Sequence, residues 1–291
     1  MNLSVADIIR VTEALAPPEL AEAWDNIGLQ VGSRDWPVKR IWVALDPLPH
    51  VVADACQADV DLLITHHPLI FKPLKSIDYT TPVGAIIGNA LQHHLTIFSA
   101  HTNLDSAADG VNDALAHRIG LRNLSVLRPA ADESRPVDEG DDMSGREPLI
   151  IQGLGRTGDL PHEQTLASLA RDMKNNLKLE SVAIAGDPDL AVGTVALCSG
   201  SGASLLGDFF ASGAQAYISG DLRYHDAREV EIAGRGLIDI GHFASEHLIV
   251  DILADRLAGE LAKTAGVVTV EAYRLEKDPF ITIDSGEAAV D

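Results

Sequence analysis

The chain has 291 residues, of which 46% are hydrophobic and 22% are charged, a composition typical of a globular protein with one large or two smaller domains. It carries 22 basic and 43 acidic residues, and its formal net charge is -21. This excess of acidic residues argues against sequence-independent binding to the phosphate backbone of nucleic acid, because such binding needs clustered Lys and Arg. It fits a highly soluble protein or a salt-rich source equally well.

The two cysteines and the N-terminal segment indicate the cellular compartment. Cys56 and Cys198 are too few for a disulfide framework, so we expect buried free thiols. The N-terminal stretch "MNLSVADIIRVTEAL" is typical of an amphipathic helix rather than a signal peptide. No apolar run reaches the roughly 18 residues needed to cross a bilayer. We therefore expect a cytoplasmic protein with no membrane partner.

The first half of the chain alternates between short apolar runs and amphipathic segments. The apolar runs predict strands at 40–46, 61–65 and 95–100. The amphipathic segments predict helices near 5–15, 48–58, 82–94 and 110–120. Near-continuous apolar strands separated by helices indicate a mainly parallel sheet that is covered on both faces.

An acidic stretch, "ADESRPVDEGDD" at 131–142, interrupts this pattern. It has no apolar periodicity that could form a core, so we interpret it as part of a solvated linker spanning 129–146.

The second half resumes the alternation. We expect strands at 147–155, 181–186, 193–200, 214–220, 236–241 and 267–273, with helices near 163–177, 203–212, 225–233 and 245–263. The predicted fold class is α/β: two linked α/β lobes with mainly parallel or mixed sheets. We expect 1–128 together with 236–291 to form one lobe and 147–235 to form the other.

Imidazole and carboxylate side chains follow several predicted strands. In open parallel sheets ligands bind beyond the carboxyl ends of the strands, so these positions are candidate site residues. The segment "DLLITHHPLIF" at 61–71 places two histidines where its strand ends. The residues concerned are His66 and His67, His101 and Asp105 in "HTNLD", Asp221 and His225 in "DLRYH", and His242 and Glu246 in "HFASE".

Mixed imidazole and carboxylate ligands suit Zn, Mn, Fe, Ni or Co. His242 and Glu246 are four residues apart at the start of a helix, so both can face one point. Taken singly, His101 reads as a half-buried histidine and Asp105 as a helix cap. Taken together at equivalent strand ends, these residues favour a metal site between the lobes. The doublet 93–94 closes a helix without a carboxylate neighbour, and we interpret it as structural.

Two further stretches have competing interpretations. "CSGSGAS" at 198–204 is either a tight turn that needs small residues or a cradle of backbone N–H groups for an anion. In "EAWDNIGLQVG", at 22–32, Trp24 is most simply a core anchor.

Five motifs carry a resemblance to a known family. They are "EAWDNIGLQVG", "ITHHPLIF", "SAHTNLD", "SGDLRYHDA" and "DIGHFASE", and they run from residue 22 to residue 246. In this order they resemble the motifs of the Nif-three-like dinuclear-metal family, whose members are commonly called GTP cyclohydrolase I type 2 homologues. Some members carry an inserted domain between the halves; here only the acidic stretch occupies that place.

The resemblance implies a site made of the strand-end residues. His66, His67, Asp105, His242 and Glu246 would bind two divalent metal ions, with Glu246 bridging them. His101 would stand beside the metals as a proton-transfer or second-sphere residue. Asp221 and His225 would line the same cavity and contact substrate, and Asp25 and Asn26 would close it. Adjacent side chains can splay where a strand becomes a turn, so His66 and His67 could each serve a different ion. The family also implies a ring-like homohexamer.

Two functions remain open. The first is a metal-dependent hydrolase of a small phosphorylated or heterocyclic, nucleotide-like molecule, with His101 moving the proton. The family name implies GTP, but no set of residues specifies guanine. The alternative is a non-enzymatic metal-binding or regulatory scaffold. A nucleic-acid partner is disfavoured by the charge.

Overall fold

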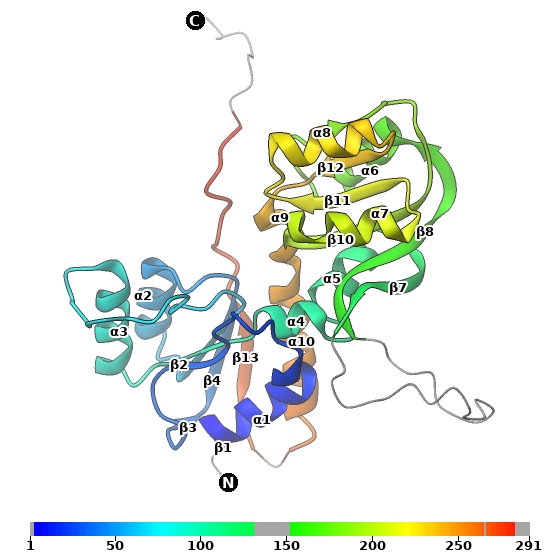
Figure 1. The fold of residues 1–291 in the computed structure, drawn as a ribbon. Coiled ribbons are helices and arrows are strands. Elements are labelled where there is room, and N and C mark those ends of the chain that lie inside the picture. Colours follow the sequence, from blue (N-terminus) through cyan, green and yellow to red (C-terminus); the bar gives the residue numbers. More distant parts are fainter. Residues whose placement is uncertain (1–2, 131–151, 265, 283–291) are drawn as a thin grey trace, which may run out of the picture.

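The computed structural model describes residues 3–130, 152–264 and 266–282 and contains two lobes, each built on a β-sheet with helices on its faces (Figure 1). The predicted α/β class with two lobes of parallel and mixed sheets is thus confirmed. The acidic stretch at 131–142 lies outside the described residues.

The sheet of the first lobe has five strands in the order β13-β4-β5-β6-β2. The first four are parallel, and β2 runs antiparallel to β6 at the edge. A separate two-stranded ribbon pairs β1 with β3. The strands are β1 (Leu3–Ser4), β2 (Gly28–Val31), β3 (Pro37–Val38), β4 (Arg40–Ala44), β5 (Leu62–Thr65), β6 (Thr96–Ser99) and β13 (Thr269–Ala272).

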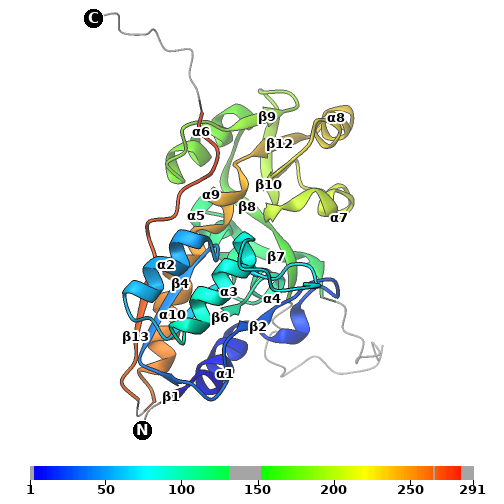
Figure 2. The same cartoon turned by 90° about the vertical axis from the view of Figure 1, so that its left-hand side faces the viewer.

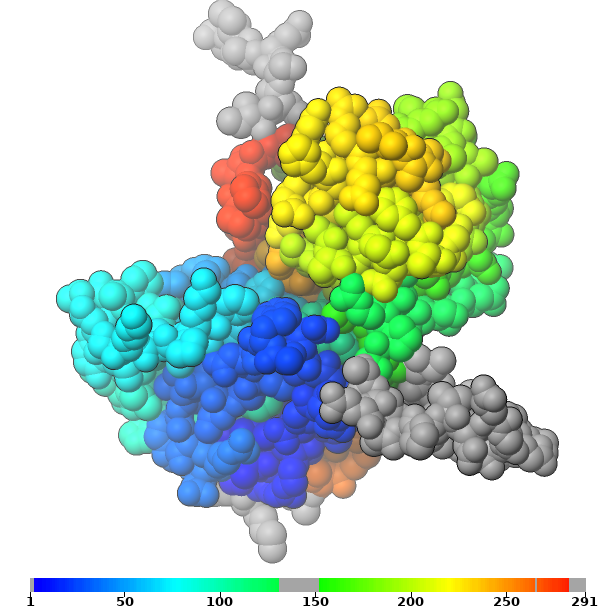
Figure 3. Space-filling model, in the orientation of Figure 1, coloured from blue at the N-terminus to red at the C-terminus, as the bar shows by residue number. Residues whose placement is uncertain are grey.

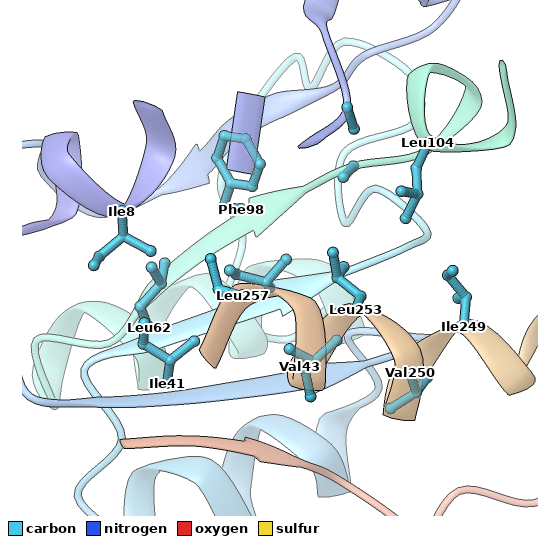
Figure 4. Close-up of a cluster of buried hydrophobic side chains, with 14 of the residues drawn as sticks. Ile8, Ile41, Val43, Leu62, Phe98, Leu104, Ile249, Val250, Leu253 and Leu257 are labelled. Carbon is cyan, nitrogen blue, oxygen red and sulfur yellow. The ribbon is translucent and has the colours of Figure 1, made fainter. Parts of the chain in front are cut away.

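Helices cover both faces of this sheet because its strands are apolar on both sides. Along β5, Leu62 faces one hydrophobic cluster and Leu63 faces the other, as the alternation of side chains in a strand requires. Figure 4 shows Ile8 and Leu257, which come from two different helices on the same face of the sheet, packing near Leu62. The helices are α1 (Val5–Leu15) and α10 (Leu248–Leu261) on this face, α2 (Pro49–Gln57) and α3 (Pro82–Gln92) on the other, and the short η1 (Pro18–Leu20).

The sheet of the second lobe has six strands in the order β7-β8-β10-β11-β12-β9. Its three central strands β10, β11 and β12 are parallel, whereas β7, β8 and β9 pair antiparallel to their neighbours. The strands are β7 (Arg122–Pro129), β8 (Gly153–Thr165), β9 (Ala183–Ala185), β10 (Ala191–Ser201), β11 (Ala216–Gly220) and β12 (Gly236–Asp239).

Helices pack on both faces of this sheet too. The helices are α6 (Leu166–Asn176) on one face, and α7 (Leu206–Ser212) and α8 (Tyr224–Ile232) with η2 (Gly202–Leu205) on the other.

The junction between the lobes contains α4 (Thr102–Ser106), α5 (Val111–Ile119) and α9 (His242–Glu246). In Figures 1 and 2 the lobes stack, and the chain passes between them through α5 and through the continuous run of α9 into α10. Helix α5 joins the two cores: Val111 packs in the core of the first lobe, and Leu115 and Ile119 pack in that of the second. The space-filling view shows the two lobes in contact along this junction (Figure 3).

Strand pairing differs from the expected division of the chain at two places. Strands β7 and β12 belong to the second sheet. The sequence pattern instead predicts that residues up to 128 and from 236 onward belong to the first lobe. Strand β7 escaped prediction because most of its side chains are exposed or half-buried, so it has no continuous apolar run. The expected strand at 147–155 is described from Gly153, where β8 begins, and β8 continues to Thr165.

Candidate metal centre

The carboxyl ends of parallel strands from both sheets meet between the lobes. Strand β5 leads directly into His66 and His67, and β6 leads through Ala100 to His101. From the second lobe, β12 leads to His242 at the first position of α9, one helical turn before Glu246. The predicted convergence at strand ends therefore occurs across two facing sheets.

Among the residues that the structure describes, three groups of side chains each present ligand atoms that lie within 4.8 Å of one another. All five residues predicted as metal ligands belong to at least one group, and His101 belongs to one as well. The groups are His67 with His242 and Glu246, His66 with Asp105 and Glu246, and His66 with His67 and His101.

Glu246 lies at the centre of this cluster, and its two carboxylate oxygens face different partners. Oε2 lies 3.0 Å from Nε2 of His67 and 2.9 Å from Nε2 of His242. Oε1 lies 3.6 Å from Nε2 of His66, and the same nitrogen lies 3.6 Å from Oδ1 of Asp105. One buried carboxylate thus separates two sets of nitrogen and oxygen donors.

Each histidine of the cluster is held through Nδ1. His67 donates to Asp46 at 2.8 Å, His101 to Asp25 at 2.9 Å and His242 to Asp221 at 2.7 Å. His66 donates to the carbonyl oxygen of Ala100 at 3.0 Å. In the neutral imidazoles these bonds keep the proton on Nδ1 and leave a lone pair on each Nε2. A carboxylate or carbonyl on Nδ1 is the usual arrangement behind a metal-bound imidazole.

The imidazole nitrogens and the carboxylate oxygen that face the centre of the cluster need a cation between them. Nε2 of His67 and Nε2 of His242 lie 3.3 Å apart, and both face Oε2 of Glu246. Lone pairs that converge in a buried place repel one another unless a proton or a metal ion lies between them. Nε2 of His66 is buried without a hydrogen-bond partner. The donor set therefore fits divalent metal ions.

The pKa values follow the same electrostatics. Burial lowers the pKa of His67, but hydrogen bonds to Asp46 and Glu246 outweigh it and raise that pKa to about 10. The hydrogen bond to Glu246 raises the pKa of His242 to about 9, against burial. Burial raises the pKa of Glu246, but the neighbouring imidazoles outweigh it and hold the pKa well below its usual range. The cluster thus attracts positive charge strongly.

The end of β10 anchors the carboxylates. The hydroxyl of Ser199 donates to Oδ1 of Asp105 at 3.3 Å, and the backbone N–H of Gly200 donates to Oγ of Ser245 at 2.8 Å. A Cβ atom on Gly200 would lie 2.1 Å from Oε1 of Glu246, and the residue has φ +60. Glycine is needed here so that the strand can approach the carboxylate. This supports the tight-turn interpretation of "CSGSGAS".

A cavity of about 1050 Å³ reaches the cluster between the lobes. His67, His242, Asp46 and Asp221 line it, together with residues 278–282 of the C-terminal segment. The structure therefore places Asp221 at the cavity wall. His225 is exposed on α8, where its ring lies 5.4 Å from that of Tyr224, and it is not among the residues that line this cavity. Its contact with substrate stays a prediction.

Sequence reasoning missed two features of the site. Asp46 follows β4 just as His67 follows β5, so the strand-end argument could have found it. Trp24 is 58% exposed, and the prediction of a core anchor is wrong. The neighbouring Asp25 explains this, because its carboxylate turns inward to accept hydrogen bonds from His101 and Thr102.

Comparison with known proteins identifies the family. A sequence model described as Duf34/NIF3 (NGG1p interacting factor 3) matches residues 3–279. The chain belongs to the Duf34/NIF3 family. It is 34% identical over 283 residues to the GTP cyclohydrolase 1 type 2 homolog of Clostridium acetobutylicum, covering 96% of this chain and 99% of that protein. It is 36% identical over 245 residues to the protein of the same name from Streptomyces coelicolor, covering 83% and 81%.

Solved structures agree with this assignment. The crystal structure of a Bacillus cereus protein related to NIF3 superposes with a TM-score of 0.87 at 27% identity, covering 97% of this chain and 99% of that one. Within the described residues, none of the helices is both long and apolar enough to cross a membrane.

Proposed function

We propose that this protein binds two divalent metal ions at the cluster and uses them to hydrolyse a small phosphorylated or heterocyclic, nucleotide-like molecule. The observation that supports this most directly is the position of Glu246, whose Oε2 faces His67 and His242 while its Oε1 faces His66. A carboxylate with one oxygen toward each donor set is suited to bridge two ions.

The chain offers a ligand set for each ion. His67, His242 and Glu246 would hold one, and His66, Asp105 and Glu246 would hold the other. The ligands combine imidazole nitrogens and carboxylate oxygens, which suits Zn, Mn, Fe, Ni or Co better than Ca or Mg. The structure and the family membership support metal binding by these residues; the number of ions and their identity are part of the proposal.

The hydrolytic step follows from the residues around the ions. The chemistry that two divalent ions would supply when held by these ligands is a lowered pKa of a bound water molecule and stabilisation of negative charge in the transition state. His101 keeps its Nδ1 on Asp25, so its Nε2 is available to take a proton and later return it. Its side chain is only 15% exposed, so this nitrogen exchanges protons mainly within the site. Asp221 orients His242 and forms part of the cavity wall.

A metal-activated assay tests the hydrolase. The protein is reconstituted with each candidate metal and assayed against nucleotides, including GTP, and simple phosphoesters, with Glu246→Gln as the inactive control. Turnover that needs metal and Glu246 is the expected result. Two bound ions without turnover of any of these compounds would favour the metal-binding scaffold instead.

We also propose self-association as a homohexamer, the assembly implied by the family resemblance. Leu74, Ile77 and Tyr79 are 42%, 58% and 63% exposed on one loop, and large exposed apolar side chains of this kind favour contacts between copies. Light scattering at micromolar concentration should give a mass near six chains; a monomer would contradict this.

A further inference from the structure

We propose that the indole of Trp24 is a stacking surface for a planar heteroaromatic ring of the substrate, next to His101, and that the tilted ring of Phe71, at an interplanar angle of 59°, borders that surface. This rests on the proposed function and narrows its substrate class. The two rings are 58% and 51% exposed, and their centroids lie 5.7 Å apart. The indole of Trp24 meets the imidazole of His101 edge-on, with centroids 6.1 Å apart. The ring of Trp24 therefore adjoins the candidate metal centre, and the ring of Phe71 lies next to that of Trp24.

The segments that carry these rings are tied to the cluster. Asp25, directly after Trp24, accepts hydrogen bonds from Nδ1 of His101 and the backbone N–H of Thr102. The side chain of Asn26 donates to the carbonyl of Ile70 at 2.6 Å, one residue before Phe71. The loops of Trp24 and Phe71 are thus bonded to each other and to a histidine of the site. Anchored segments of this kind lower the entropy that is lost when the rings they carry bind a planar partner.

Trp24 differs from the other two tryptophans. Trp36 and Trp42 are half-buried; Trp36 packs near His94, and Trp42 donates to Glu271 and packs near Tyr273. Leaving most of an indole in water forgoes the burial that stabilises a large aromatic side chain. An exposed indole beside a reactive cluster is suited to stack a ring, and such stacking tolerates different heterocycles.

The position of the rings suggests which part of the substrate lies on each side of the cluster. The cavity reaches the cluster at His67 and His242, whereas Trp24 adjoins the cluster at His101. A ring on Trp24 would lie beside the imidazole to which we assign proton transfer. Purine, pyrimidine or pyridine compounds fit this requirement; a sugar phosphate without a ring of this kind does not.

Calorimetry on the metal-reconstituted protein tests the stacking. The probes are GMP, UMP and nicotinamide mononucleotide, and ribose 5-phosphate is the control that lacks the base. We expect at least one ring compound to bind at least about tenfold more tightly than ribose 5-phosphate, because each stacked base contributes roughly a ten- to hundredfold gain. Trp24→Ala should remove this advantage, and Trp24→Phe should keep most of it.

Fluorescence gives a second readout that does not depend on turnover. The best-binding ring compound should quench tryptophan emission in the wild type, in Trp36→Phe and in Trp42→Phe, but not in Trp24→Phe. These matched variants locate the quenched indole. Unchanged quenching in Trp24→Phe would overturn the proposal.

Four other results would overturn it as well. Equal affinity of every probe, or full affinity in Trp24→Ala, would exclude a stacking surface. A changed mass of Trp24→Ala in light scattering would assign Trp24 to a contact between copies. Loss of metal from Trp24→Ala would give it a structural role. The metal proposal fails separately: a wild type that holds no metal after reconstitution, yet shows quenching through Trp24, would refute the metal centre and leave the stacking surface standing.

Discussion

The two lobes contribute differently to one site, although both present it at the carboxyl ends of parallel strands. The first lobe supplies three of the four imidazoles and Asp105, which follow β5 and β6. The second supplies His242 and Glu246 on α9, together with Ser199 and Gly200 at the end of β10. One lobe thus provides most of the donors, while the other provides the central carboxylate and the contacts that position it.

This difference makes the contact between lobes part of the site. Glu246 is 3% exposed, and it reaches histidines that belong to the opposite sheet. A shift of one lobe relative to the other would separate these groups. The two lobes must therefore keep a fixed position relative to each other. The following experiments test the contacts that hold them there and the ligands that they bring together, from the largest expected effect to the smallest.

Arg156 is the strongest candidate for this connection. It lies on β8 of the second lobe, is 3% exposed, and forms an ion pair with Asp113 of α5. It also donates to the carbonyls of Ala107, Gly153 and Gly155. We expect Arg156→Ala to lower the free energy of unfolding by about 3–5 kcal/mol, because it leaves Asp113 and several carbonyls without their partner. Urea denaturation measures this.

Arg128 provides the matched control on the neighbouring strand. It pairs with Asp208 at 2.6 Å, but the two side chains are 39% and 31% exposed. We expect Arg128→Ala to cost less than about 1 kcal/mol, since water screens this pair. If both variants lowered the free energy of unfolding by similar amounts, burial of Arg156 between the lobes would add nothing to its stabilising effect.

The second experiment compares a donor from each lobe. Glu246→Gln removes the charge that faces both donor sets, so we expect both ions to bind at least about a hundredfold more weakly. His67→Ala should weaken mainly one ion, because a single Nε2 serves a single ion. Calorimetric metal titration separates the two patterns. Two tightly bound ions in Glu246→Gln would exclude it as the bridge and direct attention to Asp105.

The third experiment weakens the support of one imidazole from each lobe. Asp46 holds His67, and Asp221 holds His242, in the same ligand group. Replacing either by Asn should reduce affinity for that ion by about 10–100-fold and leave the other ion bound. The Asp221 side chain is 47% exposed against 33% for Asp46, so Asp221→Asn should have the smaller effect. A loss at the other ion instead would contradict this ligand grouping.

The sequence predicted those parts of the fold that depend on local pattern. The strands β4, β5 and β6 are apolar on both faces, and Pro82 begins α3 as expected. Strand ends also predicted the donors of the cluster, because the direction of parallel strands brings those ends to one edge. The family resemblance, and not spacing, suggested how the donors are divided between two ions.

The remaining features depend on long-range packing that no local pattern encodes. β12 is short and apolar, and only its pairing with β11 places it in the second sheet. Trp24 looks like a core residue, yet Asp25 beside it occupies the buried position. The need for glycine at 200 arises from the carboxylate of Glu246, which lies 46 positions later in the chain.

The smallest effect concerns Asp25, which acts within the first lobe alone. Burial raises the pKa of its carboxyl group, but hydrogen bonds from His101 and Thr102 outweigh this and hold the pKa at about 2, below the ordinary 3.8. A lowered pKa in the folded state stabilises the protein fully above the ordinary value, and the contribution is lost as the pH falls toward 2. Because water partly screens this half-buried residue, the loss amounts to about 1 kcal/mol. Urea denaturation of metal-free protein between pH 5 and about pH 2.5 should therefore show a steeper acid loss in the wild type than in Asp25→Asn. Parallel curves would mean that Asp25 does not hold His101 through a charged carboxylate, and the assignment of proton transfer to the free Nε2 of His101 would lose its basis.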